Sequence, residues 1–183
     1  KAPRIAPLLS TVAVALIRGF VRSRTDRLID NAETYDRVLE ALNGARRSIR
    51  IAQLAFDYDC LAYGSDASAR APSGDVLLAD ALLAHAASDG PEIQILLNAT
   101  WLLNTARPLR RAFARRGILA DRIEVRGFNR FPHFMHAKLV LVDAREAFLL
   151  GSPLVNSYWD DPRHVPFDAR RPLALGGKAY EAH

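Results

Sequence analysis

The chain has 183 residues, half of them hydrophobic and a quarter charged, which is enough apolar material for one sizeable core. This composition excludes a disordered or collagen-like protein, and the single cysteine, Cys60, excludes a disulfide framework. The net charge of +5 suits an anionic partner such as a phosphate, a nucleic acid or a lipid headgroup. Only three of the 25 basic residues are lysines, so a lysine inside a motif is a rare event in this sequence.

An apolar stretch over 5–17 opens the chain, interrupted by Pro7 and Ser10. It is too short to span a bilayer as a helix. The basic residues Lys1 and Arg4 in front of it resemble the start of a signal peptide, but no small-residue cleavage site follows. We therefore expect a buried strand over 11–17 and no transmembrane anchor.

Helical and strand patterns alternate along the rest of the sequence. Apolar residues at helical spacing predict helices over 33–46 and 75–87 and a third helix with Pro108 in its first turn. A segment rich in Asp, Ser, Gly and Pro predicts a loop over 57–74. Apolar and alternating runs predict strands over 48–54, 93–97, 123–126, 137–142 and 147–150. We expect a single domain over 1–183, an α/β sandwich with a mixed, partly parallel β-sheet flanked by helices.

The residues with the clearest chemical potential begin at His136. On a regular strand over 137–142, His136 and Lys138 point to the same face of the sheet. An imidazole beside a fixed ammonium can attack a phosphodiester while the cation holds the non-bridging oxygens. The positive charge also favours the neutral imidazole, which is the form that can attack.

Four further polar or turn residues follow the His-x-Lys pair. Gly151 is expected to permit a tight turn, and Ser152 and Asn156 offer neutral donors to the same phosphate. Asp143 falls on the opposite face by strand parity, which suits a structural role better than direct attack. Each feature is common by itself in strand ends and turns. Their order on consecutive predicted strands indicates a functional site.

This order of residues resembles the signature of the phospholipase D superfamily, which is His-x-Lys, four residues, Asp, then Gly-Ser and a downstream Asn. The matching residues are His136, Lys138, Asp143, Gly151, Ser152 and Asn156. The spacing from Asp143 to Gly151 is one residue longer than usual, and Asn156 follows Ser152 by four residues where three is commoner. Residues 153 and 158–160 resemble a bacterial lipid-acting branch. The resemblance implies a phospholipase D-like α/β sandwich.

The resemblance also implies a phosphodiester exchange in two steps without a metal or cofactor. One histidine forms a phosphohistidine intermediate, and a histidine from a second motif protonates the leaving group. His136 would be the nucleophile or its acid partner, with Lys138 and Asp143 in the catalytic set. The phosphate-binding residues would be Gly151, Ser152 and Asn156. No other histidine is followed two residues later by lysine, so a second motif would come from another chain or another half of a duplicated enzyme.

Several alternatives follow from this interpretation. We expect the N-terminal half or a nicked fragment of a duplicated enzyme, ahead of a homodimer subunit. The expected substrate is a phospholipid, hydrolysed or transferred to an alcohol at a transiently bound membrane surface. The alternatives are a homodimeric nuclease of the same superfamily and a non-catalytic binding module. We expect a secreted or cell-envelope bacterial protein slightly ahead of a cytoplasmic one, and the absent initial Met and the unpaired Cys60 are compatible with secretion.

The remaining candidates have simpler interpretations. His133 could line the pocket or serve as a capping or core residue, and Tyr158 and Trp159 are expected to pack in the core rather than meet an acyl chain. The pairs 46–47 and 115–116, all arginine, are interpreted as solvated faces, with phosphate steering as the alternative. No His, Cys or carboxylate cluster has metal-ligand spacing.

Overall fold

The computed structural model describes residues 25–28, 31–60, 62, 77–117, 122–158, 164, 173–174 and 179–180. The strand expected over 11–17 lies outside these residues, as does most of the loop expected over 57–74. No helix in the described part of the chain is long and apolar enough to cross a membrane.

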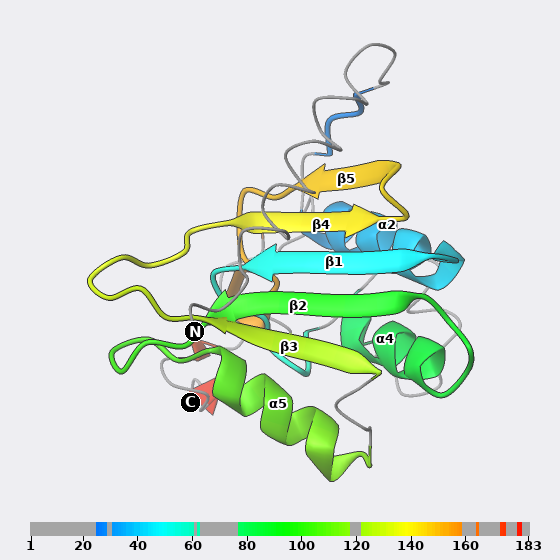
Figure 1. Ribbon diagram of the computed structural model, residues 1–183. Coiled ribbons are helices and arrows are strands. Elements are labelled where there is room, and N and C mark those ends of the chain that lie inside the picture. The colour runs from blue at the N-terminus through cyan, green and yellow to red at the C-terminus, as the bar shows by residue number, and fades with distance from the viewer. Residues whose placement is uncertain are drawn as a thin grey trace.

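A five-stranded sheet forms the centre of the domain (Figure 1). Its strands are β1 (Ser48–Gln53), β2 (Glu92–Asn98), β3 (Ile123–Phe128), β4 (Lys138–Val142) and β5 (Glu146–Leu149). They lie in the order β3-β2-β1-β4-β5, with β1, β2 and β3 parallel, β4 antiparallel to β1 and β5 antiparallel to β4. The predicted mixed, partly parallel sheet is confirmed. A small antiparallel pair, β6 (Leu173–Ala174) and β7 (Ala179–Tyr180), forms a second sheet.

The helices connect and cover these strands. They are α2 (Asn31–Gly44), α4 (Leu78–Ala86) and α5 (Ala106–Arg115), and a 3₁₀ turn η2 follows at Asn156–Tyr158. Helix α4 joins β1 to β2 and α5 joins β2 to β3, which are the crossovers that parallel neighbours require. Figure 1 shows α2 and α4 on one face of the sheet and α5 along the β3 edge. The three helices match those predicted from apolar spacing.

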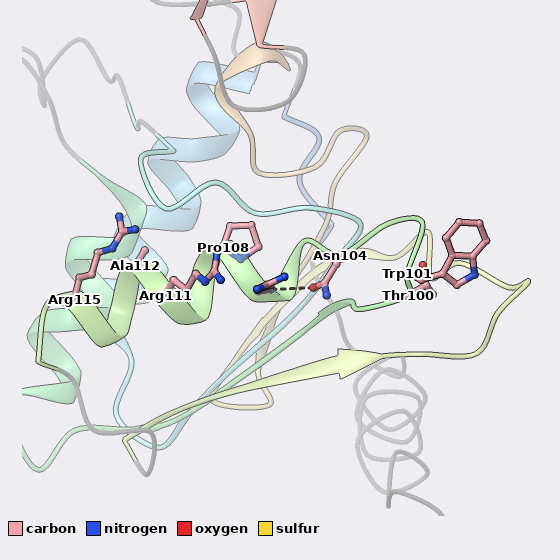
Figure 2. Close-up of a pocket in the computed structure, with 8 residues that line it drawn as sticks. Thr100, Trp101, Asn104, Pro108, Arg111, Ala112 and Arg115 are labelled. Atoms are coloured by element: carbon pink, nitrogen blue, oxygen red, sulfur yellow. Dashed lines mark hydrogen bonds between the residues drawn. The ribbon is translucent and has the colours of Figure 1, made fainter.

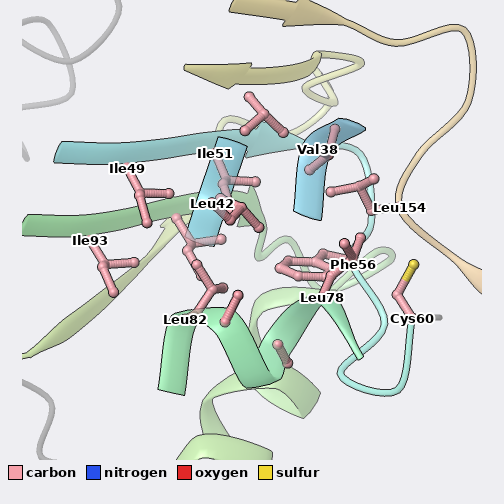
Figure 3. Close-up of a cluster of buried hydrophobic side chains, with 14 of the residues drawn as sticks. Val38, Leu42, Ile49, Ile51, Phe56, Cys60, Leu78, Leu82, Ile93 and Leu154 are labelled. Carbon is pink, nitrogen blue, oxygen red and sulfur yellow. The ribbon is translucent and has the colours of Figure 1, made fainter. Parts of the chain in front are cut away.

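The main core lies between α2, α4 and the face of the sheet that they cover. Ile49 and Ile51 alternate inward on β1 and meet Leu42 of α2 and Leu82 of α4, all almost fully buried (Figure 3). Burying one such side chain contributes about 1.5–3 kcal/mol, so this cluster supplies much of the stability of the fold. Burial also raises the pKa of the Cys60 thiol, which keeps it protonated in this apolar setting.

The opposite face of the sheet has a smaller apolar cluster. Ala52 and Leu96 are buried there, and partly buried apolar residues pack against them: Phe128, Met135, Ala137 and Leu139. Two of these packing residues, Met135 and Ala137, flank His136 in the sequence. The second cluster therefore helps to fix the segment that brings His136 to the sheet.

Candidate phosphodiester site

The candidate site lies where the carboxyl ends of β1 and β2 meet the start of β4. Lys138 is the first residue of β4 and pairs with Gln53, the last residue of β1. The Nζ of Lys138 lies 3.1 Å from Nδ1 of His136, so the two motif residues meet as the strand parity predicts. In the tautomer that leaves Nδ1 unprotonated, this nitrogen can accept a hydrogen bond from the ammonium. The two motif side chains are thus within hydrogen-bonding distance of each other.

Asn98 fixes the residue immediately before His136. Its buried side chain accepts a hydrogen bond from the Met135 amide at 2.9 Å and donates to the Met135 carbonyl at 2.9 Å. The same Nδ2 also donates to the carbonyl of Leu54, just after β1, at 3.2 Å. The sequence interpretation missed Asn98, although a polar residue ending an apolar strand is a recognisable signal. Three segments are therefore joined at this end of the sheet by one amide.

Gln53 is the second residue that the sequence interpretation missed. Its side chain is fully buried, and neither Oε1 nor Nε2 has a hydrogen-bond partner among the residues that the structure describes. It is directly opposite Lys138 in the β1–β4 register, so both side chains lie on the same face of the sheet. A buried amide without partners costs about 1–3 kcal/mol, and such groups are rare in native proteins. Gln53 is therefore a group with unused hydrogen-bonding capacity beside the motif lysine.

Gly151 and Ser152 leave the sheet next to the motif pair. The Leu150 amide donates to the carbonyl of Lys138 at 2.9 Å, so the Gly-Ser turn begins from a residue bonded to the motif lysine. The φ angle of Gly151 lies outside the left-handed region, and a Cβ there would meet nothing within 4 Å. The conformational role expected for Gly151 is thus not found. Its lack of a side chain leaves open space beside Ser152.

The segment from Ser152 to Asn156 is anchored to α2 and to the loop after β1. The hydroxyl of Tyr35 donates to the Pro153 carbonyl at 2.9 Å and forms a hydrogen bond with the Ser152 side chain. Burial is the largest cause that raises the pKa of Tyr35, which remains a neutral phenol. The Nδ2 of Asn156 donates to the Asp59 carbonyl at 2.7 Å. At least one amide hydrogen of Asn156 therefore serves the fold rather than a ligand.

Asp57 places a carboxyl group against this segment. Its backbone amide donates to the Leu154 carbonyl at 3.0 Å. Burial and then the nearby charge of Asp59 raise the pKa of Asp57, against a smaller opposite effect of the Asn156 backbone N–H. The charged form of Asp57 is thus less stable in the folded protein than in water.

Asp143 lies at the far end of β4, and the structure does not bring it to His136. Its carboxylate accepts backbone N–H bonds from Arg47 at 2.7 Å, Ser48 at 2.9 Å and Arg46 at 3.0 Å. Partial burial alone would raise the pKa of Asp143, but these bonds outweigh it and lower the pKa. The residue itself has a φ of 54° at the end of the strand. Asp143 therefore holds the turn that enters β1, as strand parity suggested.

The other candidates have no direct connection to the motif pair in the described residues. His133 is exposed and its amide donates to the Arg130 carbonyl at 2.8 Å. Tyr158 is 55% exposed, so the expectation that it packs in the core is wrong, and Trp159 lies outside the described residues. In the part of the chain that the structure describes, no three His, Cys, Asp or Glu side chains are grouped to hold a metal ion. The expectation of metal-free chemistry stays a prediction.

Fold and motif together define a domain of the phospholipase D type, and a comparison with protein families supports this. The model for the cardiolipin synthase, PLD-like domain matches residues 38–153, which is more than half of the chain. The chain belongs to this family, and hence to the phospholipase D superfamily of phosphodiester-acting proteins. The match includes His136, Lys138, Asp143, Gly151 and Ser152 and ends before Asn156.

Comparisons with individual proteins add little to the family match. A search of curated proteins finds none that matches. Among solved structures, the chain is similar at 17% identity and a TM-score of 0.38 to TrmBL2, an archaeal chromatin protein described as having a novel mode of DNA binding. The similarity covers 78% of this chain and 47% of that one, so it spans about half the length of that protein. A similarity this weak carries no argument about function.

Proposed function

We propose that the chain is one motif-bearing half of a phospholipase D-like phosphodiesterase that cleaves or transfers the headgroup of a phospholipid. The observation that carries the proposal is the 3.1 Å contact between Lys138 and His136, formed beside the buried, unpartnered amide of Gln53. A nucleophile, a cation and a spare hydrogen-bond donor thus lie at one end of the sheet. The family match supports the phosphodiester as the substrate class.

Substrate binding would redirect the motif lysine. A phosphodiester is a better partner for an ammonium than an imidazole is, because the hydrogen bonds are then charge-assisted on both sides. Lys138 would turn to a non-bridging oxygen and release the lone pair on Nδ1 of His136. The Nε2 of Gln53 would donate to the same group, which gives its buried amide the partner that it lacks. Ser152 and Asn156 would complete the phosphate site from the neighbouring turn.

The exchange would then proceed through a covalent intermediate. A ring nitrogen of His136 attacks phosphorus, the bond from phosphorus to the headgroup oxygen breaks, and that oxygen takes a proton from a second histidine. Water next attacks the phosphohistidine and gives its proton back to the second histidine as the phosphorus–nitrogen bond breaks. An alcohol in place of water gives headgroup transfer instead of hydrolysis. Lys138 neutralises the charge that gathers on the non-bridging oxygens in both steps.

The second histidine is proposed to come from outside the motif of this chain. His85, His133, His164 and His183 are not followed by the required lysine, and Nε2 of His85 is 2.6 Å from the Leu42 carbonyl. Another half of a duplicated enzyme would supply the missing motif, with a second copy of this chain as the other source. A secreted or cell-envelope location remains part of the prediction and is compatible with a lipid substrate.

The proposal is tested with phosphatidylcholine and phosphatidylglycerol vesicles in buffer that contains a chelator, with the chain alone and with a co-expressed partner half. We expect headgroup release that His136→Ala abolishes and that the matched variant His133→Ala leaves within twofold of wild type. Acid quenching during turnover should trap a phosphoryl group on His136, located by mass spectrometry. Cleavage of DNA with no headgroup release would favour the nuclease alternative, and activity that survives His136→Ala would overturn the catalytic proposal.

A further inference from the structure

Two loops project from the same end of the sheet as the candidate site (Figure 1). One, over 99–105, joins β2 to α5, and the other, over 129–137, joins β3 to β4. Both carry large apolar side chains into solvent: Trp101 is 78% exposed, Leu102 62%, Phe131 53% and Phe134 39%. Single exposed apolar residues are ordinary, but four on two adjoining loops form a patch that needs an explanation. We call these four residues the apolar patch.

The two loops are held together, so that the patch is one surface. The rings of Trp101 and Phe131 are 5.5 Å apart between centroids, across the gap between the loops. At the bases of the loops, the Ala99 amide donates to the Phe128 carbonyl at 2.9 Å. Gly127 allows this approach, because a Cβ there would lie 2.4 Å from the Ala99 Cβ. The apolar patch is thus built on a fixed platform rather than on independent loops.

The same platform is tied to the catalytic pair. Asn98 precedes the first loop and bonds both backbone groups of Met135, the residue next to His136 in the second loop. A surface that seats the apolar patch would therefore also fix the position of His136 relative to that surface. This link is short, since one side chain joins the two loops at their bases.

A row of arginines continues from the patch along α5. Arg107, Arg111 and Arg115 are spaced four residues apart, so they share one face of the helix. They line a groove of about 540 Å³ that also includes Trp101 at one end (Figure 2). Helix α5 contains no acidic residue, and none of the three arginines has an ion-pair partner in the described part of the chain. The groove therefore presents uncompensated positive charge directly beside exposed apolar side chains.

We infer that the apolar patch and the α5 arginines form a docking face for an anionic lipid bilayer. This inference rests on the proposed function and names the surface on which that function operates. Apolar loop tips enter the boundary between headgroups and acyl chains, while arginines beside them bind the phosphates of anionic lipids. An indole suits this depth, since one side of it is apolar and its N–H remains near water. The docked bilayer would deliver headgroups to the end of the sheet that holds His136.

The composition of the patch favours lipid over nucleic acid. Single-stranded nucleic acid is bound by aromatic faces on which bases stack. Leu102 has no such face, and the Trp101 ring already packs against Phe131. The boundary between headgroups and acyl chains accepts both aliphatic and aromatic side chains, so all four patch residues contribute to binding in the lipid case.

The first experiment uses Trp101 itself as the probe. The full chain has two tryptophans, so Trp159→Phe leaves Trp101 as the only one. We expect its emission to shift to the blue on vesicles of phosphatidylcholine with phosphatidylglycerol, and brominated acyl chains to quench it. Emission that is already blue without vesicles would mean that another part of the protein or a second copy covers the patch. That result, or an unchanged spectrum on vesicles, overturns the inference.

The second experiment separates patch, arginines and catalysis by vesicle co-sedimentation. A double variant of the patch, Trp101→Ser with Phe131→Ser, should bind vesicles about tenfold more weakly than wild type. A triple variant of α5, with each of its three groove arginines replaced by Gln, should lose the preference for anionic vesicles: Arg107→Gln, Arg111→Gln and Arg115→Gln. Leu149→Ser and Arg145→Gln are the matched controls, because both residues are exposed on or beside β5 at the opposite edge of the sheet. Equal binding by patch and control variants would refute docking, as would loss of DNA binding without loss of vesicle binding.

His136→Ala distinguishes this inference from the proposed function. It should lose headgroup release and bind vesicles as wild type does. If the chain docks on vesicles through the patch but His136→Ala has no effect on turnover, the catalytic proposal fails and the docking face stands. If turnover depends on His136 but the patch variants bind vesicles as well as wild type, the docking face fails and the catalytic proposal stands.

Discussion

The two ends of β4 carry the two parts of the His-x-Lys-x4-Asp motif. They differ in how fully their polar side chains are hydrogen-bonded. At the far end, the Asp143 carboxylate accepts three backbone N–H bonds. At the near end, the Gln53 amide is buried opposite Lys138 and has no hydrogen-bond partner in the described part of the chain. Within the described residues, the Asp143 carboxylate thus has hydrogen-bond partners, and the Gln53 amide has none.

Two carboxyl groups, one at the far end of β4 and one in the segment that follows β1, show the same contrast. Backbone hydrogen bonds lower the pKa of Asp143, whereas burial and the neighbouring Asp59 raise the pKa of Asp57. Polar groups that stabilise a fold are hydrogen-bonded or charged in the folded protein. In a binding site, some polar groups lack hydrogen-bond partners when no ligand is bound. The difference indicates that Asp143 works for the fold and that the Lys138 end works for a ligand.

The largest expected effect is on turnover, at the near end. Replacing His136 by Ala removes the nucleophile or its acid partner, and Lys138→Gln removes the charge that holds the phosphate, so either change should lower headgroup release by about 10³-fold or more. Single-turnover assays measure this loss, with thermal unfolding to show that the variants remain folded. Comparable losses in His133→Ala would mean that the pair has no special place in the reaction.

The next effect is on stability, at the far end. Asp143→Ala leaves three backbone N–H groups without their shared acceptor and should lower the free energy of unfolding by about 2 kcal/mol. Urea unfolding measures the change. Turnover per folded molecule should stay within twofold of wild type. A stable variant that has lost its turnover would place Asp143 in the chemistry and end the contrast between the two ends.

Replacing Gln53 is expected to raise the stability of the protein and to lower its activity. Gln53→Leu replaces an unpartnered amide by an apolar group of similar size, which should raise the free energy of unfolding by about 1 kcal/mol. Headgroup release should fall by about tenfold, because a hydrogen-bond donor to the phosphate is lost. Gln94→Leu is the control, since the Gln94 amide already donates to Glu92 at 2.8 Å. Unchanged turnover in Gln53→Leu would remove Gln53 from the site.

Periodicity was sufficient to predict most of the fold. Helix spacing and strand alternation each report which side of an element faces apolar neighbours, so the mixed sheet and its three helices followed from the sequence. The same parity predicted that His136 and Lys138 lie together, and their side chains are in contact. These predictions depend on residues close in sequence, for which regular geometry is enough.

The residues that periodicity missed depend on register and on packing between distant segments. The importance of Gln53 depends on the β1–β4 register, which places it opposite Lys138, 85 positions later in the chain. Asn98 has the sequence pattern of an ordinary strand end, and only the packing of the distant 129–137 loop brings Met135 to its side chain. Gly151 was expected to be needed for a turn, but its φ is ordinary and what it provides is space. Sequence patterns do not encode cross-strand register or free volume directly.

The smallest expected effect tests the contrast between the two carboxyl groups by pH. The lowered pKa of Asp143 means that its carboxylate stabilises the fold above the ordinary pKa of 3.8 and loses this contribution as the pH falls through the folded-state value. Asp143→Asn should therefore be less stable than wild type at neutral pH, with the difference in the free energy of unfolding closing below about pH 4.

The raised pKa of Asp57 predicts the opposite dependence of stability on pH. The fold favours the protonated form of Asp57 and loses that contribution as the pH rises. Asp57→Asn should therefore be the more stable protein at neutral pH, by about 1 kcal/mol or less, and should approach wild type in acid. Urea unfolding across this pH range measures both differences, and differences of the same sign would show that the surroundings of the two carboxyl groups do not have the opposite effects described here.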